Sequence, residues 1–375
     1  MKKFVLSLCT VSMFLVQAAF ATPDTKTVNC NQGKKIQDAV DSVKDGNDTT
    51  IDISGVCTEN VVIRNFSGSS LILTSSSGAT INDASAGAQP IILAVDSRVV
   101  TISKLILNSQ SGIQLSNCTG CNVVGNTITI SRNGVAANNA SGGIFDNTIH
   151  LNVPLGGGSG VVVASFSNYV LSHNTISGAG SPAVPGLGLL VTQSSRAQIN
   201  PGAGASEITA VSTGIHVEAG SSVQLSGTPS LTCGNPLTTC FNVHHNNIGV
   251  LASGARVNIQ SATIKDNNIG LQIFLGSSLA LFNSVVDHSS ISGVQISDNS
   301  SMALGGTTIR PSSLRGITAG NLSTVSAGGP NNDVSGTTTG IDIACDATSR
   351  VTGTSFLPGS TIVCASTSLT SSPLP

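Results

Sequence analysis

Acidic, basic and imidazole side chains recur at a regular spacing in the C-terminal half of the chain. Four of them directly follow an Ile or Val that ends a short apolar run, and they lie 21, 22 and 23 residues apart: His244, Lys265, Asp287 and Arg310. The neighbours that follow three of them are His245, Asp266 and His288. An imidazole or a carboxylate can move a proton, and a cation can neutralise a carboxylate. A row of this kind therefore suits general acid–base chemistry on an acidic substrate.

A glycine followed by an aliphatic residue punctuates the apolar runs that must position these side chains. The pair recurs at intervals of 21 to 28 residues, with one interval of 35. It occurs at Gly112-Ile113, Gly134-Val135, Gly160-Val161, Gly188-Leu189, Gly214-Ile215, Gly249-Val250, Gly270-Leu271, Gly293-Val294, Gly316-Ile317 and Gly340-Ile341. A near-constant period of this length is typical of a solenoid, in which each repeat stacks on its neighbours.

Each repeat contains three short stretches with apolar residues two apart, as in Leu271/Ile273 and Leu279/Leu281. A period of two indicates β-strands, and the Gly, Ser, Asn and Asp between the stretches favour turns. Three strands in about two dozen residues predict an all-β fold, a single-stranded right-handed parallel β-helix. The leucine-rich-repeat pattern and the calcium-binding Gly-Gly-x-Gly-x-Asp nonapeptide are both absent. In such a β-helix the charged row becomes a ladder with one member per coil.

The N-terminal segment predicts a cap over the open end of this solenoid. Ile36, Ala39, Val40 and Val43 recur at helical spacing, so we expect a short amphipathic helix whose apolar face covers the first coil.

The run around this helix carries a resemblance to a known superfamily. It extends from Cys30 through Ile51-Asp-Ile-Ser-Gly-Val-Cys57 to Gly78-Ala-Thr-Ile81. It resembles the entry segment of right-handed parallel β-helix proteins of the pectin-lyase-like superfamily. The resemblance covers essentially the whole mature chain as architecture and matches no single enzyme family. It implies polysaccharide as partner and, if the protein is catalytic, lyase or epimerase chemistry, in which a cation neutralises a uronate and a base takes its C5 proton.

The resemblance gives the charged row candidate roles. The catalytic candidates are His244, Lys265, Asp287, His288 and Arg310, and the substrate-binding candidates are His245 and Asp266. Lys265 or Arg310 would clamp the carboxylate, and His244 or His288 would move the proton. Of the Trp-Ile-Asp-His motif of pectate lyases only Asp287-His288 remains. The paired-Asp and Gly-His-Gly pattern of polygalacturonases and the Gln/Asp/Arg set of pectin esterases are absent.

A structural interpretation of the same row stands beside the catalytic one. Turn residues of a solenoid face water and are often charged, and opposite charges on neighbouring coils stabilise it modestly. Three function classes follow: a secreted polysaccharide-active enzyme, a non-catalytic adhesin or glycan-binding protein, and a structural solenoid of a cell envelope.

A second row consists of asparagines. Asn126, Asn147 and Asn174 each precede Thr-Ile, which predicts a ladder of stacked amides at a sharp turn. We expect Asn246-Asn247 and Asn267-Asn268 to belong to the same row.

The chain begins with the features of a secretory signal peptide. Lys2 and Lys3 precede an apolar run, and Ala19-Phe20-Ala21 provides small residues for cleavage. We therefore divide the chain into a signal peptide (1–21), one parallel β-helix domain (22–364, with the cap and first coil at 22–57) and a disordered tail rich in Ser, Thr and Pro (365–375). We expect a secreted protein, periplasmic, cell-surface or extracellular, with no membrane span.

Eight cysteines remain after removal of this segment, an even number in an exported chain. Their placement favours four local disulfides: Cys30 with Cys57 at the cap, Cys118 with Cys121, Cys233 with Cys240 in the long interval, and Cys345 with Cys364 at the C-terminal end. Zinc is the competing interpretation of the Cys118-x-x-Cys121 pair, but no second pair lies at ligand spacing. We expect no metal and no cofactor.

Composition limits the partners. Charged residues make up 9% of the chain, its formal net charge is −2, and no basic stretch suggests nucleic acid. Aromatic residues make up only 3%, which disfavours the usual aromatic sugar subsites.

Overall fold

The structure is a computed structural model of the 375-residue chain. It describes residues 24–44, 47–152, 157–179, 186–200, 206–226, 241–310, 314–328, 331–335, 337, 340–353, 356 and 361–364. The expected signal peptide, the Cys233–Cys240 disulfide and the expected C-terminal tail lie outside these residues.

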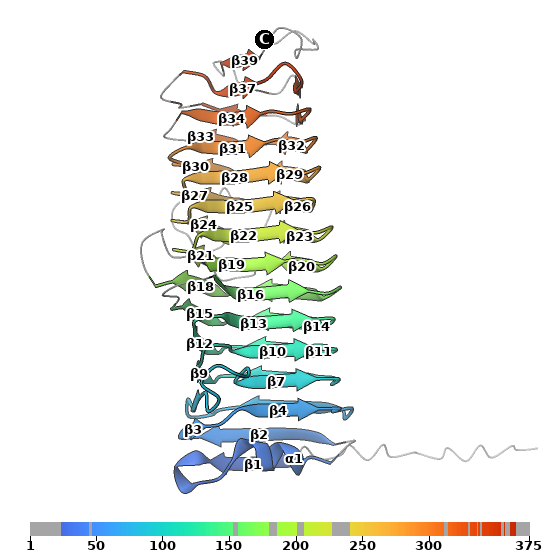
Figure 1. Cartoon of the computed structure of the whole chain (residues 1–375), viewed down its shortest axis with the longest axis vertical. Helices are drawn as coiled ribbons and strands as arrows, with labels where there is room; N and C mark the ends of the chain where they lie inside the picture. Colours follow the sequence, from blue (N-terminus) through green and yellow to red (C-terminus); the bar gives the residue numbers. More distant parts are fainter. Residues whose placement is uncertain are drawn as a thin grey trace, which may run out of the picture.

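Three parallel sheets wind around a common axis and form an elongated rod (Figure 1). Sheet A consists, in spatial order, of β1 (Asp24–Asn29), β2 (Asp48–Ser54), β5 (Ser70–Thr74), β8 (Val100–Ser103), β11 (Thr119–Val124), β14 (Ser141–Phe145), β17 (Asn168–Ser172), β20 (Arg196–Ile199), β23 (Ser222–Ser226), β26 (Arg256–Gln260), β29 (Ser278–Phe282), β32 (Ser301–Gly305), β35 (Thr324–Ala327) and β38 (Arg350–Thr352). Sheet B consists of β3 (Val56–Thr58), β6 (Thr80–Asn82), β9 (Ile106–Asn108), β12 (Thr127–Ile130), β15 (Thr148–Leu151), β18 (Thr175–Gly178), β21 (Glu207–Thr209), β24 (Phe241–His244), β27 (Ala262–Lys265), β30 (Val285–Asp287), β33 (Thr308–Arg310) and β36 (Asp333–Val334). Sheet C consists of β4 (Val61–Arg64), β7 (Ile92–Val95), β10 (Ile113–Ser116), β13 (Asn133–Asn138), β16 (Gly158–Ala164), β19 (Gly186–Val191), β22 (Thr213–Glu218), β25 (Ile248–Ser253), β28 (Ile269–Phe274), β31 (Ser292–Ile296), β34 (Arg315–Ala319), β37 (Ile343–Cys345) and β39 (Ile362–Cys364).

From β2 to β37, each coil takes one strand from each sheet, in the order A, B, C. The chain runs through β26, β27 and β28, and β29 then pairs with β26 in parallel. The three-strand coil and the parallel stacking expected from the sequence are confirmed.

The inward side chains of successive coils stack into continuous columns. Ile264, Val286 and Ile309 pair in register on sheet B, and each is at most 1% exposed. A buried side chain of this size contributes about 1.5–3 kcal/mol through the hydrophobic effect. One core therefore runs along the described part of the rod.

The glycine that begins each repeat is required by the stacking itself. A Cβ on Gly270 would lie 2.5 Å from the carbonyl oxygen of Gly293 in the next coil and 2.6 Å from Cγ1 of Val286. Gly249 has the same relation to Gly270, with 2.5 Å to its carbonyl oxygen. The punctuating glycines from Gly112 to Gly316 thus form a column in which each lacks a side chain because the next coil fills that space. Gly340 does not belong to it: no atom lies within 4 Å of its Cβ position, and Gly316 faces the carbonyl oxygen of Asp342 instead.

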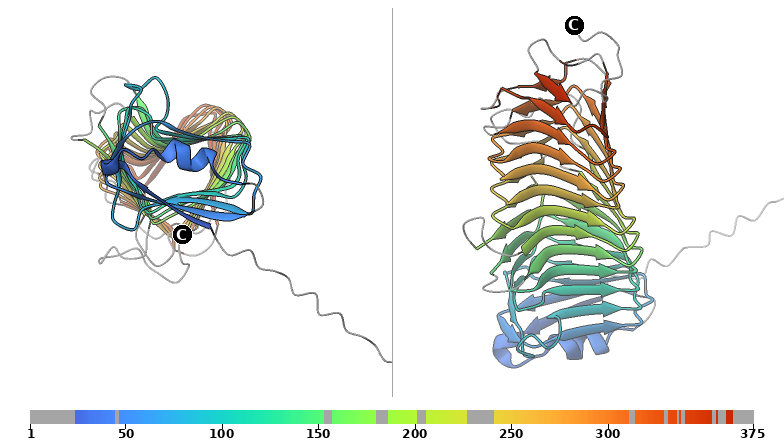
Figure 2. Two further views of the ribbon diagram at one scale, coloured as in Figure 1. Left: turned by 90° about the horizontal axis from the view of Figure 1, so that it is seen from below. Right: turned by 45° about the horizontal axis from the view of Figure 1, so that its top comes forward.

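The cap closes the N-terminal end. Seen along the axis, the helix α1 (Ile36–Asp41) lies across the first coils (Figure 2). Ile36 is fully buried, and its amide donates to the carboxylate of Glu59 at 2.9 Å, which caps the helix. The 3-10 helix η1 (Cys30–Gln32) precedes it, and β1 pairs in parallel with β2 at this end of sheet A.

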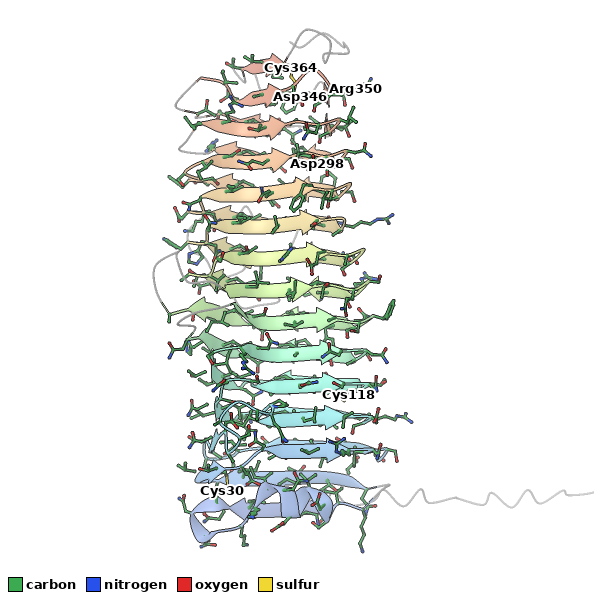
Figure 3. All side chains as sticks on the ribbon, in the orientation of Figure 1. Cys30, Cys118, Asp298, Asp346, Arg350 and Cys364 are labelled. Carbon is green, nitrogen blue, oxygen red and sulfur yellow. A yellow bond between two sulfur atoms is a disulfide. The ribbon has the colours of Figure 1, made fainter. Side chains whose placement is uncertain are left out.

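Three of the four expected disulfides lie within the described residues. They join Cys30 to Cys57, Cys118 to Cys121 and Cys345 to Cys364. Figure 3 shows Cys30 near one end of the rod, Cys118 further along it and Cys364 near the other end.

The asparagine ladder exists, but the prediction that Asn246 and Asn267 continue it is wrong. Asn126 donates to Asn147 at 3.0 Å, and Asn147 donates to Asn174 at 3.0 Å, all at the turn from sheet A to sheet B. Asn246 and Asn267 lie instead at the turn from sheet B to sheet C, where the Asn246 amide donates to Asn267 Oδ1 at 2.9 Å. Both turns use a left-handed residue followed by Asn, which made them look alike.

We expect Gly270→Ala to lower the free energy of unfolding by at least about 2 kcal/mol, because the backbone of the next coil must move to admit a methyl group. Gly328→Ala is the matched control, since no atom lies within 4 Å of the place its methyl group would occupy and its φ is not left-handed. Chemical denaturation followed by circular dichroism measures both variants. Equal midpoints for the two would contradict the stacking argument.

Tyr169, the single tyrosine, tests the core. It is fully buried opposite Gly142 and Ala197, burial raises its pKa, and its hydroxyl has no hydrogen-bond partner among the described residues. Tyr169→Phe should therefore keep the stability or raise it by up to about 1 kcal/mol. Tyr169→Ala should cost about 3–5 kcal/mol. A clear loss of thermal stability in Tyr169→Phe would show that the hydroxyl is hydrogen-bonded after all.

Candidate functional site

The pairing register brings the charged row together. His244 pairs with Lys265, Lys265 with Asp287, and Asp287 with Arg310, each as the last residue of its strand on sheet B. Adjacent members are one coil apart, about 4.8 Å along the axis. The regular spacing in the sequence is therefore a ladder in space.

The residues that follow the ladder begin the turn to sheet C. His245, Asp266 and His288 have left-handed backbones, with φ of 55°, 54° and 49°. The Nδ1 atom of His288 lies 2.9 Å from Oδ2 of Asp287, and Nζ of Lys265 lies 3.9 Å from Oδ2 of Asp266. At these three coils the turn therefore places a second polar side chain beside the ladder residue. We use the name strip for the ladder (His244, Lys265, Asp287 and Arg310), the turn residues His245, Asp266 and His288, and two carboxylates described below, Glu207 and Asp333.

Glu207 is a member of the strip that the sequence did not reveal. It begins β21 on the coil before His244, and its Oε1 accepts a hydrogen bond from Nε2 of His244 at 2.6 Å. The connection between β23 and β24 makes the pair 37 residues apart in sequence, outside the 21- to 23-residue spacing. Thr209 pairs with His244 in the register of sheet B, and this pairing would have revealed that Glu207 lies near His244.

His244 and His245 extend this contact into a relay. Their rings meet edge to face with centroids 4.8 Å apart, and their Nδ1 atoms are hydrogen-bonded to one another. With Nε2–H of His244 donated to the Glu207 carboxylate, Nδ1 of His244 accepts from Nδ1–H of His245. The lone pair of His245 Nε2 is then free of this chain of bonds, on an exposed ring.

The protonation state of His244 follows from its burial. Only 17% of its side chain is exposed. Burial lowers the pKa of His244 below its ordinary value, while the hydrogen bond and charge of Glu207 act in the opposite direction. Lys265 also lowers it. His244 is therefore neutral near pH 7 and can accept a proton.

The other end of the strip is an ion pair. Arg310 donates from Nε at 3.0 Å and from Nη2 at 2.6 Å to the same oxygen of Asp333. The guanidinium charge is thus compensated, whereas Lys265 approaches its carboxylate only at 3.9 Å. Of the two cations expected to bind a substrate carboxylate, Lys265 therefore has the weaker interaction with a carboxylate of the protein.

Three further histidines lie outside the strip. His150 occupies the same row three coils earlier and contacts Ser177 at 2.9 Å. His173 pairs with Asp146 at 3.1 Å. On sheet C, Nε2 of His216 lies 3.5 Å from Glu218, and burial lowers the pKa of this imidazole despite that carboxylate.

The described residues offer one close group of possible metal ligands, Cys30, Cys57 and Glu59. The two sulfurs are joined in a disulfide and the carboxylate caps α1, so the group is structural. In the described part of the chain, no helix has the length and apolar character needed to cross a membrane.

These observations define the class: a right-handed parallel β-helix protein with an imidazole- and cation-bearing strip on one sheet. Residues 42–229 match the family model described as right handed beta helix region, and the chain belongs to this family. No curated protein matches the chain.

Solved structures share the fold at low sequence identity. The chain is similar to the catalytic domain of a GH87 α-1,3-glucanase in complex with nigerose, with 12% identity, a TM-score of 0.53, and coverage of 88% of this chain and 68% of that one. It is also similar to the periplasmic alginate epimerase AlgG (13%, 0.46, 88% and 84%) and to the A-module of the Azotobacter vinelandii mannuronan C-5 epimerase AlgE4 (13%, 0.46, 87% and 93%). These similarities concern the fold.

The titration of His244 tests the relay. In Glu207→Gln the group that raises the pKa of His244 loses its charge, so this pKa should fall further below 6.5. Long-range proton–nitrogen NMR of the imidazoles measures it. Glu218→Gln, which changes the carboxylate beside His216, should leave the His244 titration unchanged. A His244 pKa that rises in Glu207→Gln would contradict the assigned contact.

Proposed function

We propose that this protein is a secreted polysaccharide-active β-helix protein that removes the C5 proton of a uronate residue at the strip. The observation that carries the proposal is the Glu207–His244–His245 relay beside Lys265. The resemblance to the pectin-lyase-like superfamily supports the substrate class.

The relay supplies the base. His245 is exposed and offers Nε2 to the substrate, while its Nδ1–H donates to His244 and the Glu207 carboxylate accepts from His244. A proton taken up at His245 Nε2 can be balanced by transfer of its Nδ1 proton to His244. Glu207 then stabilises the positive charge on the inner imidazole, as a positioning residue.

Lys265 supplies the electrophilic contribution. Removal of a C5 proton places negative charge on the adjoining carboxylate, and a cation one coil from the base stabilises that charge as it develops. Asp266 lies 3.9 Å from the ammonium, far enough to leave it partly available. Arg310, held by Asp333, is assigned to binding the substrate further along the strip.

The C5–H electron pair then has two fates. Return of a proton to the opposite face of C5 gives the epimer. Alternatively, the pair forms a C4–C5 double bond, the bond from C4 to the glycosidic oxygen breaks, and that oxygen takes a proton as the leaving group. Both outcomes share the first step, so the test addresses that step.

The experiment incubates the mature protein with alginate, polymannuronate or polygalacturonate in heavy water and measures deuterium at C5 by NMR. Ultraviolet absorbance of the unsaturated product separates elimination from epimerisation. We expect deuterium at C5, or the unsaturated product, with at least one polymer, and a loss of about 10²- to 10⁴-fold in the rate of either reaction in His245→Ala or Lys265→Ala. His150→Ala is the matched control, since it changes an imidazole in the same row outside the relay.

Each result bears on the proposal. Exchange or elimination that persists at the original rate in His245→Ala would overturn the assigned base. The absence of both C5 deuterium and unsaturated product with every polymer would overturn the enzymatic function and favour the non-catalytic class, an adhesin or a structural solenoid.

A further inference from the structure

A groove runs along the outer face of sheet A, away from the strip on sheet B. Two hollows of about 570 and 830 Å³ adjoin each other there and share Asn258, Ala303 and Ser326 in their linings. The lining residues come from the six strands β20 to β35 of this sheet and from the turns that follow them. Five inter-strand intervals of about 4.8 Å give the groove a length of roughly 24 Å along the rod.

Small outward side chains form the floor of the groove. Ser278, Ala280, Ser301 and Ala303 occupy adjacent rungs of β29 and β32. Asn258 beside them adds an amide that can donate and accept. The floor therefore offers hydrogen bonds without filling the space.

The groove is positively charged. Arg196 and Arg256 belong to its lining, and neither hollow has an Asp or Glu among its described lining residues. Arg196 donates to Gln224 at 3.3 Å, and both arginines are exposed. In a chain of net charge −2 this local excess of cations is complementary to a polyanion.

An aromatic ring lies at the other side. Phe282 is 36% exposed, and its partner across the strands is Gly305. A Cβ on Gly305 would lie 2.6 Å from Cδ1 of Phe282, so the ring rests where that side chain would be. The ring thus presents apolar surface to the second hollow, the kind of surface against which the apolar face of a sugar ring packs.

We propose that this groove is a second binding site, which holds a linear anionic polysaccharide along the rod axis. Arg196 and Arg256 bind the anionic groups, Asn258 and the serines of the floor bind hydroxyls, and Phe282 packs against a sugar ring. The site does not depend on the chemistry proposed for the strip, because no strip residue lines it.

Fluorescence anisotropy of labelled oligogalacturonate, and of a neutral malto-oligosaccharide of the same length, tests this site on the mature protein. We expect micromolar to millimolar binding of the uronate probe that weakens with added salt, and much weaker binding of the neutral probe. Arg256→Ala and Phe282→Ala should each weaken the uronate affinity roughly tenfold. Ala280→Gln, which fills the floor from the surface, should weaken it as well.

Matched controls locate the effect. Arg64→Ala removes an exposed arginine from sheet C, and Phe166→Ala removes a phenyl ring that is 77% exposed at the turn between sheets C and A. Both should bind like the wild type. Circular dichroism and thermal unfolding verify that every variant keeps the β-helix.

The outcomes separate this site from the strip. Wild-type affinity in both Arg256→Ala and Phe282→Ala, or no binding of the uronate probe, would overturn the proposal. Loss of affinity confined to Arg310→Ala would also overturn it, and would place the polymer on the strip. Equal affinity for the neutral probe would overturn the anionic specificity. If the protein bound no glycan but bound another protein, and Arg256→Ala abolished that binding, the groove would be assigned to another class of partner.

Discussion

Parallel pairing between successive coils is the constraint on which the rest of this structure depends. A one-residue slip would turn every inward side chain of a strand outward, so the columns of Ile, Val and Leu hold the register wherever the core continues. The glycine column strengthens this constraint, because Gly249, Gly270 and Gly293 must face one another for the coils to approach. Additional residues are therefore accommodated between strands, as between β23 and β24, and not within them.

The same constraint explains what the sequence could predict. Between His244 and Arg310 every coil has nearly the same length, so equal spacing in sequence became adjacency in space. Glu207 escaped because the β23–β24 connection interrupts that spacing, although it contacts His244 at 2.6 Å. The fold class needed only the period and the alternation of apolar residues, whereas the site needed the register of individual strands.

Turn chemistry explains the assignment that failed. A left-handed residue followed by Asn satisfies buried backbone groups at two different corners of the coil. At one corner Oδ1 of Asn147 accepts a hydrogen bond from the backbone amide of Asn126, and at the other Oδ1 of Asn267 accepts one from the backbone amide of Asn246. The local sequence is the same because the local problem is the same. Only the strands on either side, Thr148–Leu151 after one turn and Ile269–Phe274 after the other, distinguish the corners.

The two proposed sites differ in how their charges are compensated, and this difference separates their functions. On the strip, Glu207, Asp287 and Asp333 each hold a basic or imidazole partner within 3 Å, so the charges there are compensated in pairs, and the Glu207–His244 pair can exchange a proton. On sheet A, the described lining of the groove carries arginines without carboxylates, which favours retention of an anion over proton transfer. A stacked solenoid permits both, because each sheet presents its own outward rows while all three share one core. The contact of Phe282 with Gly305 illustrates this. The two residues are 23 positions apart, and neither belongs to a recognisable motif. Only the pairing register places the phenyl ring over a residue that has no side chain.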